Sequence, residues 1–547
     1  MTKHTDPNGP NGPQLSRRQA IVSALGAGFG LSLLAACGGS DDSGGSGDSS
    51  PAGSTTPSDT GGASPASGGT LRVAFNDGGA QETLNPLLLP TFIETARAQQ
   101  IYDRLFQQQA DLSLTPLLAE SLESNDDATV WTLKLRQGVT FHDGTPFTAD
   151  DVLWTLNLVA DPDSASEAAT SVEPIDLGAT RKISDHSIEF HLNRPIGDFA
   201  RLLGSKALLI VPDGQSEFTA ETANGTGPFK LKEFLIGERT VLTANENYHA
   251  GRPHVDTVEM IQIPDNTARF NALQGGQVEA MIFLEYPQAK ALEGDDSVQL
   301  IRGPGSVTVP FTMRVDEAPF NDPKVREAFK LAVDRQQMVD NVLLGFGRVG
   351  NDVFGDGYPS FNQSLEQREY DPERAKELLA EAGHPDGLTV TLYTSDAGPG
   401  MKESATALKE QASAAGINIQ IETLDSAEYF ANDLYLSAPF YQSFWSEAFE
   451  NVAQGALLPD SPYNETGWPL EGSDWADRFR EAQGIAADDE RNAIYGQLQE
   501  ELWAEGGYII WGFGDLVDAA SPKVKGIVPN GVFPLGHFNF KDWSIEP

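Results

Sequence analysis

Residues 129–152 read TVWTLKLRQGVTFHDGTPFTADDV, a stretch that passes from one type of secondary structure to another. Alternating apolar and polar residues at its start predict a β-strand with Trp131, Leu133 and Leu135 on one face. An Asp-Gly turn follows, and Thr148 is then well placed to cap a helix. A strand followed closely by a helix is typical of an α/β protein.

The helix after this turn has Asp151 as its third residue, which makes a short relative of the capping box. Trp154 and Leu158 are four residues apart, so both are predicted to lie on its buried side. Two later helices begin with Asp-Pro. One is predicted over residues 322–345 and the other over residues 371–383, each closed by a glycine.

Composition excludes one large class of function. The 547 residues include 79 acidic and 37 basic side chains, which gives a formal net charge of −42. Because nucleic-acid binding depends on Lys and Arg that neutralise phosphates, we expect no nucleic-acid partner.

The length predicts two or three lobes. The single cysteine, Cys37, cannot form an internal disulfide.

The N-terminus predicts export. Arg17 and Arg18 precede an apolar run over residues 20–36 that ends with Leu-Ala-Ala before Cys37. This order is typical of a signal peptide, and the paired arginines indicate the twin-arginine route. The Leu-Ala-Ala-Cys run resembles a bacterial lipobox, so residues 1–36 are predicted to be cleaved and Cys37 to carry lipid. The alternative, a membrane-spanning helix, needs about 20 apolar residues, and this run is shorter and contains glycines.

Residues 37–69 comprise Cys37 and a segment that has no Lys, Arg, aromatic or large aliphatic residue. Such a Gly/Ser-rich composition cannot bury enough apolar surface to offset chain entropy. It predicts a flexible tether with a typical span on the order of 30 Å.

Common catalytic and metal-binding motifs are missing. Residues 345–350 match G-x-G-x-x-G, but they follow a predicted helix rather than a strand, so we interpret them as a helix end and a loop. His186 with His191, and His249 with His254, lack ligands at metal-binding spacing, which favours loop or surface positions. No cofactor or metal is expected. A glycosidase-type carboxylate pair stays open in so acidic a chain.

Several ordered segments are similar to the family 5 solute-binding proteins of ABC importers, which include oligopeptide-, dipeptide- and nickel-binding members. The segments are IYDRLF (101–106), PLLAES (116–121), the stretch over 131–152, GTGPF (225–229), NENYHAGRP (245–253), PFNDPKVREA (319–328) and YDPERAKELL (370–379).

The resemblance implies a two-lobed α/β periplasmic-binding-protein type II fold with an additional inserted domain. Solute would bind between lobes that close around it and would pass to a membrane permease and its ATPase. By family analogy, lobe I comprises residues 70–107, 205–281 and 516–547, the inserted domain 108–204, and lobe II 282–515.

Aromatic residues concentrate between residues 429 and 449, with eight in 21 positions. They are interpreted either as core or as a wall that binds solute. Peptide-binding relatives carry an aspartate after the tryptophan that pairs with the ligand's α-amine, and only Glu447 or Glu450 could replace it here. The candidate binding residues of this stretch are Tyr441, Phe444, Trp445, Glu447 and Phe449.

A second wall is expected from the resemblance at Phe92, Ile93, Glu94 and Thr95, which would run beside a bound peptide. Arg314 is a candidate for a ligand carboxylate, with a surface ion pair as the alternative.

Together these features predict a lipid-anchored, monomeric, extracytoplasmic receptor, not an enzyme, for a small peptide or similar organic solute. Alternatives within the family are a nickel chelate, an oligosaccharide or an opine-like compound. Alternatives outside it are a secreted hydrolase with an unrecognised carboxylate pair and a sensory lipoprotein that binds solute without transport.

Overall fold

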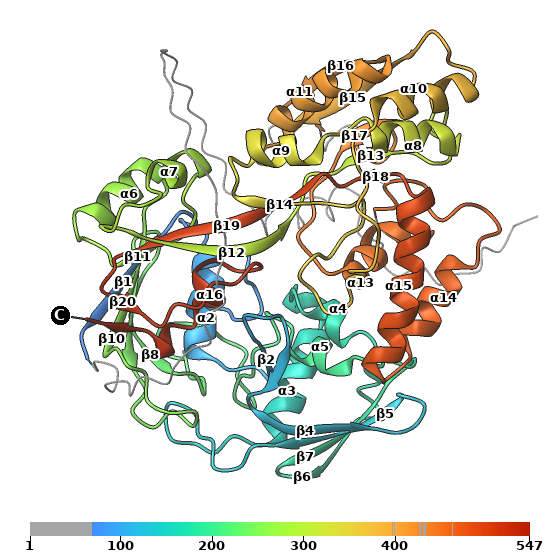
Figure 1. The fold of residues 1–547 in the computed structure, drawn as a ribbon. Helices are drawn as coiled ribbons and strands as arrows, with labels where there is room; N and C mark the ends of the chain where they lie inside the picture. Colours follow the sequence, from blue (N-terminus) through green and yellow to red (C-terminus); the bar gives the residue numbers. More distant parts are fainter. Residues whose placement is uncertain are drawn as a thin grey trace, which may run out of the picture.

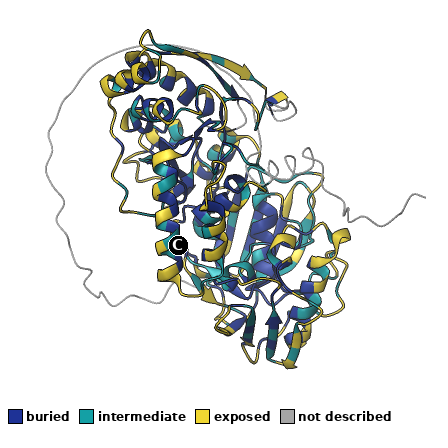
Figure 2. Cartoon of the chain, turned by 90° about the vertical axis from the view of Figure 1, so that its right-hand side faces the viewer, coloured by how far each residue is buried: buried dark blue, intermediate teal, exposed yellow. Residues whose placement is uncertain are grey.

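The computed structural model describes residues 68–395, 398, 400–425, 428–429, 434–461 and 463–546. Within them, the chain forms two α/β bodies, each built on its own sheet (Figure 1). Buried residues fill the interior of both (Figure 2). None of the helices in these ranges is long and apolar enough to cross a membrane. The predicted α/β class is confirmed.

Lobe I contains an eight-stranded sheet in the order β12-β19-β11-β1-β10-β9-β8, with β14 also pairing with β19. Helices α2 (Phe92–Ile101), α6 (Asn266–Gln274), α7 (Tyr286–Ala291) and α16 (Pro534–Phe538) belong to this body. The strands are β1 (Thr70–Phe75), β8 (Phe229–Leu235), β9 (Arg239–Ala244), β10 (Thr257–Gln262), β11 (Ala280–Met281), β12 (Gln299–Val307), β14 (Gly347–Val349) and β19 (Gly512–Ala520).

The inserted domain has a four-stranded antiparallel sheet in the order β4-β5-β7-β6, and its core is continuous with that of lobe I. The hairpin β2 (Phe106–Gln108) and β3 (Leu114–Pro116) leads into it. Its elements are β4 (Ala119–Ser124), β5 (Val130–Leu135), α3 (Ala149–Ala160), α4 (Ala169–Val172), β6 (Arg181–Ser184), β7 (Ser187–His191) and α5 (Phe199–Leu203).

Lobe II has a five-stranded sheet in the order β16-β15-β17-β13-β18. Its strands are β13 (Phe311–Met313), β15 (Leu388–Ser395), β16 (Ile417–Leu424), β17 (Phe440–Gln442) and β18 (Tyr508–Ile509). Its helices are α8 (Pro323–Leu331), α9 (Arg335–Val342), α10 (Pro372–Glu381), α11 (Met401–Ala412), α13 (Phe449–Val452), the π-helix η3 (Ala453–Leu457), α14 (Trp475–Gln483) and α15 (Asp488–Glu505).

The antiparallel strands β12 and β19 join the two bodies. Both belong to the sheet of lobe I; β12 is followed after a few residues by β13 of lobe II, and β19 is preceded closely by β18 of lobe II (Figure 1). Because β12 is part of the lobe I sheet, lobe I includes the chain up to Val307, whereas the predicted boundary with lobe II lies after residue 281. The two bodies are thus connected by two neighbouring chain segments. Such a connection is suited to a hinge, because few residues must change conformation when the lobes move.

The stretch that predicted the fold forms β5 and α3. Trp131, Leu133 and Leu135 are all buried, which confirms the strand prediction. Thr148 and Asp151 form a reciprocal capping box at the start of α3, which confirms the predicted helix start.

The prediction for the buried face of α3 is confirmed in part, because Trp154 and Leu158 pack against the core but are not the most buried residues of the helix. Val152 and Leu156 are fully buried, whereas Trp154 and Leu158 are only half-buried. The indole of Trp154 donates to the carbonyl oxygen of Gln215 at 2.8 Å. This bond keeps the ring at the edge of the core, as suits a side chain with one polar end.

The predicted long helix over residues 322–345 is two helices, α8 and α9. Asp322 caps the first as expected, but Asp334 caps a second by accepting from the backbone N–H of Gln337 at 2.9 Å. The glycine motif after α9 also differs from the predicted loop, since Gly347 begins β14. The helix predicted over residues 371–383 is confirmed as α10, with its N-cap at Asp371.

Candidate functional site

One tryptophan lies where the joining strands enter lobe II. Just past β12, Thr308 and Trp445 exchange both backbone hydrogen bonds, at 2.8 Å and 3.0 Å. Ser306 Oγ donates to the carbonyl oxygen of Ser446 at 2.8 Å. These three bonds fix the backbone of Trp445 against the hinge strand.

The Trp445 ring is half-buried and belongs to an aromatic group, Phe354, Trp445 and Tyr463, which we call the Trp445 wall. Phe354 and Tyr463 meet the tryptophan edge to face, with ring centroids 6.4 Å and 6.3 Å away. Gly455 in η3 leaves room for the indole, because a Cβ atom there would lie 3.2 Å from its Cη2. Partly exposed aromatic faces of this kind bind apolar groups and cations.

A fully buried carboxylate, Glu465, lies behind the Trp445 wall. Its hydrogen-bond donors are Trp445 Nε1 at 3.3 Å from each oxygen, Ser443 Oγ at 2.5 Å, and the hydroxyls of Tyr435 and Tyr508, each at 2.8 Å. All of these donors are neutral. In the described part of the chain, no Lys, Arg or His nitrogen lies within 4.0 Å of the carboxylate.

The lack of a nearby cation affects the pKa of the Glu465 carboxyl. Burial raises the pKa of Glu465, although the hydrogen bonds from its four neighbours act against this. Burial, followed by the charge of Glu465, raises the pKa of Tyr441 and Tyr508. Glu465 is therefore a candidate functional group, because perturbed carboxyls concentrate at functional sites and this one lies directly behind a partly exposed aromatic ring.

Glu447 lies two residues beyond Trp445, on the side of the inserted domain. Its side chain is exposed, yet desolvation by the surrounding protein raises the pKa of its carboxyl, against a hydrogen bond with Asn451 and the charge of Lys206. The exposed surface and the raised pKa are compatible if solvent reaches the side chain while protein surrounds it on most sides. Glu447 belongs to lobe II and Lys206 follows the inserted domain, so opposite charges approach this junction from both bodies.

The two bodies touch on this side. The backbone N–H of Gly197 donates to the carbonyl oxygen of Gln483 at 2.8 Å. Arg201 Nε lies 3.9 Å from Glu450 Oε1. A small buried cluster of Leu112, Tyr358 and Ala448 also joins the inserted domain to lobe II.

Lobe I contributes a second aromatic group, Phe92, Phe283 and Phe533, which we call the Phe92 wall. Phe283 and Phe533 lie edge to face with Phe92, with centroids 5.0 Å and 6.5 Å away. Asp77 accepts from the backbone N–H of Phe92, and Asp518 from that of Phe283 at 2.9 Å. Burial raises the pKa of Asp77 to about 6 and that of Asp518 to about 7.

The comparisons with known proteins agree with this architecture. Residues 113–455 match the bacterial extracellular solute-binding proteins, family 5 (middle part). The chain belongs to this family. Its members work outside the cytoplasm, and its relatives are binding proteins.

Two curated relatives resemble this family 5 solute-binding protein over most of their length. Heme-binding protein A of Haemophilus influenzae is 27% identical over 488 residues, which cover 82% of this chain and 88% of the relative. Glutathione-binding protein GsiB of Escherichia coli K12 is 27% identical over 483 residues, which cover 85% and 92%.

Solved structures show the same two-lobed fold. HbpA2 from Haemophilus parasuis superposes with a TM-score of 0.78 at 22% identity, covering 88% of this chain and all (100%) of that one. The oligopeptide-binding protein AppA of Bacillus subtilis, in complex with a nonapeptide, gives 0.67 at 23% identity, covering 88% and 100%. The predicted two-lobed fold is therefore confirmed.

The predicted binding residues of the solute-binding protein fall into two groups. Exposed or half-buried side chains, which have surface to offer a solute, are Phe92, Arg314, Phe444, Trp445 and Glu447. Buried side chains are Ile93, Glu94, Thr95, Tyr441 and Phe449. The buried group supports the walls from behind; for example, the hydroxyl of Tyr441 donates to the backbone carbonyl of Glu465 at 2.9 Å.

Arg314 already has partners. Its Nη2 lies 2.6 Å from Asp316 Oδ2, and its Nη1 donates to the carbonyl oxygens of Leu436 and Asn464. A ligand carboxylate would have to displace this ion pair. Cys37, Arg17 and Arg18 lie outside the described residues, so their roles stay predictions.

Proposed function

We propose that this protein is the receptor of an ABC importer and binds a small peptide or a similar organic solute between the Trp445 wall and the Phe92 wall. The observation that carries the proposal is the position of Trp445, which is half-buried, pairs through its backbone with Thr308 just past β12, and has the exposed acid Glu447 two residues away. Relatives named for glutathione and peptides support this class of solute.

The two walls suit the two kinds of group in a short peptide. Aromatic faces at Trp445 and Phe92 would take apolar side chains. Glu447 would accept an α-ammonium group, and Lys206, which pairs with Glu167 at 3.2 Å, would have to share or exchange that partner to bind a carboxylate. The zwitterionic ends of a peptide match these opposite charges at one junction.

The membrane attachment is proposed on sequence alone. Arg17 and Arg18 would direct twin-arginine export, and lipid on Cys37 would anchor the mature chain. The tether over residues 38–69 would then hold the receptor close to its permease and raise its effective concentration there.

The test begins with native mass spectrometry of the purified protein, which identifies co-purified solute, followed by calorimetry with that compound, glutathione and short peptides. We expect Trp445→Ala and Glu447→Ala each to weaken binding by about 1–3 kcal/mol, through lost apolar contact or a lost charge-assisted hydrogen bond. Trp154→Ala and Glu377→Ala are matched controls remote from the walls. Unchanged affinity in both test variants would show that the site is elsewhere, and turnover of the bound compound would favour a hydrolase.

A further inference from the structure

A polar cavity lies inside lobe I, at the C-terminal end of α2. It is lined by the end of α2, by residues 102–107, by residues 537–541 and by Pro228 and Tyr248. It gives about 40 Å³ of room to the centres of water-sized molecules, enough for a few waters or one small ion. One lining residue, His537, stacks on Phe533 of the Phe92 wall, so the cavity lies next to that wall.

Arg104 lines this cavity with a guanidinium that lacks a counter-ion. The residue is only 5% exposed, and no carboxylate oxygen of the described residues lies within 4.0 Å of its side chain. Its one acceptor there is Gln99 Oε1, 2.8 Å from Nη2 once the amide is turned so that both groups are satisfied. A guanidinium carries five N–H donors, so most of those on Arg104 point to no protein acceptor. Burial lowers the pKa of Arg104 to about 10, against the charge of Asp103.

His537 adds a second unsatisfied group to the same cavity. Both of its ring nitrogens are buried without a hydrogen-bond partner among the described residues. Burial, and then the charge of Arg104, lowers the pKa of His537 to about 3, so its ring is neutral and keeps one N–H donor. The ring stacks on Phe533, with centroids 4.5 Å apart.

The backbone holds His537 in an unusual conformation. Leu535, His537 and Phe538 have φ values of 48°, 64° and 56°, a left-handed turn that residues other than glycine rarely adopt. Residues kept in such conformations cluster at ligand clamps. Here the turn fixes the imidazole at the cavity.

The acidic residue of the cavity is already satisfied. Asp103 accepts from the hydroxyl of Tyr248 at 3.0 Å, from Thr226 Oγ1 at 3.0 Å and from His249 Nε2 at 2.9 Å. The groups with hydrogen-bonding capacity left are Arg104, whose guanidinium only donates, and the neutral His537 ring, which offers one N–H donor and one acceptor nitrogen. A buried cation with unfilled N–H groups is costly unless an acceptor pairs with it.

We infer that this cavity binds a small oxyanion, with Arg104 and His537 as its ligands. Phosphate, sulfate and carboxylate all present the paired oxygens that match the guanidinium fork. A bound oxyanion would connect the end of α2, the segment after it and the C-terminal segment. The site adjoins the Phe92 wall through the contact of His537 with Phe533, but its two ligands are not among the predicted solute-binding residues.

The direct test is a crystal of the purified protein soaked in selenate, whose selenium gives an anomalous signal. We expect a peak within hydrogen-bonding distance of Arg104 and His537. In solution, sulfate at constant ionic strength should raise the Tm by on the order of 2–5 °C relative to chloride, because the ligand binds only the native state. Acetate and phosphate in the same assay distinguish planar from tetrahedral oxyanions.

Variants separate this site from general salt effects. Arg104→Met should abolish the sulfate-dependent rise in Tm, whereas Arg374→Met, at an exposed arginine of α10, should keep it. An equal rise in Arg104→Met and wild type, or ordered water alone in the selenate-soaked crystal, would overturn the inference. If Arg104→Met does not fold, the wild-type soak still decides the question.

Discussion

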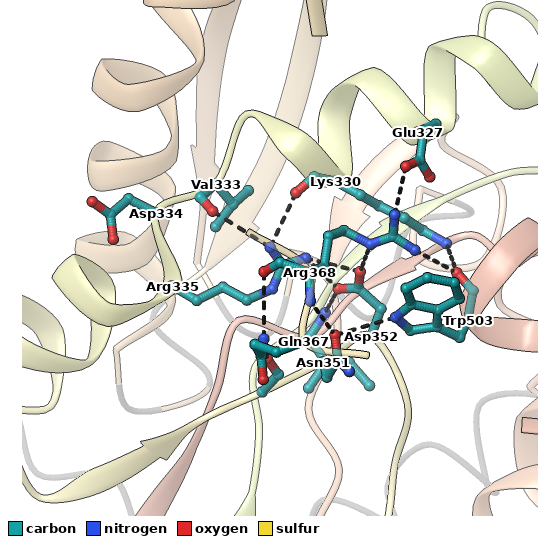
Figure 3. A network of polar contacts seen from close by, with 12 residues as sticks. Glu327, Lys330, Val333, Asp334, Arg335, Asn351, Asp352, Gln367, Arg368 and Trp503 are labelled. Carbon is teal, nitrogen blue, oxygen red and sulfur yellow. Dashed lines mark hydrogen bonds and ion pairs between the residues drawn. The ribbon is translucent and has the colours of Figure 1, made fainter. Parts of the chain in front are cut away.

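Lobe II contains two fully buried carboxylates, Asp352 and Glu465, whose charges are balanced in opposite ways. Arg335 Nη2 lies 2.8 Å from both oxygens of Asp352, and Arg368 Nε lies 2.9 Å from one of them (Figure 3). Glu465 has hydrogen bonds from neutral side chains only. The two carboxyls therefore differ in the partners that surround them, not in burial.

Their acidities diverge accordingly. Burial opposes ionisation of Asp352, but the charges of Arg335 and Arg368 hold the pKa of this carboxyl below its ordinary value. Burial raises the pKa of Glu465, and no nearby cation reverses the change. Within the described part of lobe II, the buried carboxylate without a cation therefore lies directly behind the Trp445 wall, whereas the one among the packed helices is paired with two arginines.

The Asp352 cluster connects the helices of lobe II. Arg368 also binds Glu327 of α8 at 2.6 Å and stacks over Trp503 of α15, with its guanidinium carbon 4.2 Å from the ring centroid (Figure 3). Lys330 donates to the carbonyl oxygen of Trp503 at 2.8 Å, and burial lowers the pKa of Lys330 to about 7. Removing the central carboxylate would leave all these cations without their shared partner.

Asp352→Ala should produce the largest effect. It leaves the buried guanidinium of Arg335 without a carboxylate and Arg368 with Glu327 alone, which we expect to lower the free energy of unfolding by about 3–5 kcal/mol. Denaturant unfolding of the purified protein measures the loss. Asp356→Ala is the matched control, because Asp356 pairs with the partly exposed Arg348 and should cost about 1 kcal/mol or less. Equal losses in the two variants would contradict a special role for the Asp352 cluster.

Glu465→Gln and Asp352→Asn should change the pH dependence of stability in opposite directions. A raised pKa in the folded state means that wild type loses stability as pH rises from the ordinary pKa of Glu to that of Glu465. Glu465→Gln removes this decline, so the unfolding free energy of wild type should fall relative to that of the variant as pH rises from acid towards neutral.

The lowered pKa of Asp352 has the opposite effect on the pH dependence of stability. Its stabilisation is present above the ordinary pKa of Asp and is lost as pH falls through the folded-state value. Asp352→Asn should therefore cost most near neutral pH and least in acid. Unfolding measured across this pH range tests both variants, and parallel pH profiles would remove the contrast between the two carboxylates.

The sequence predicted local structure well where local interactions decide it. The capping box at Thr148 and the alternation around Leu133 depend on neighbours within a few residues, and both predictions are confirmed. The long helix over residues 322–345 failed because apolar spacing continues across Asp334, while the side chain of that residue starts a new helix. A capping residue in the middle of a periodic pattern is hard to distinguish from a surface residue by sequence alone.

The site was predictable only in part. Aromatic density identified the region of Trp445, but Glu465 was one of 79 acidic residues with no local mark. Its partner Tyr508 is 43 positions away and becomes a neighbour through the sheet order β17-β13-β18. The donors that define a buried carboxylate come from segments that only the tertiary fold brings together.

Trp445→Phe should give the smallest effect and the sharpest test of the contrast. It keeps an aromatic ring in the wall but removes one of the four side chains that donate to Glu465, so we expect a loss of about 0.5–1.5 kcal/mol in unfolding free energy. Trp154→Phe is the matched control, since its indole donates to a neutral backbone carbonyl at 2.8 Å.

The two tryptophan variants should differ in how their losses depend on pH. A hydrogen bond to a carboxylate is worth more when the carboxylate is charged, so the cost of Trp445→Phe should grow as pH rises and Glu465 ionises. The cost of Trp154→Phe should stay constant, because its acceptor does not titrate. Unfolding of both variants at pH 5 and pH 8 measures this difference directly. A cost for Trp445→Phe that does not vary with pH would mean that the charge of Glu465 does not act on the wall.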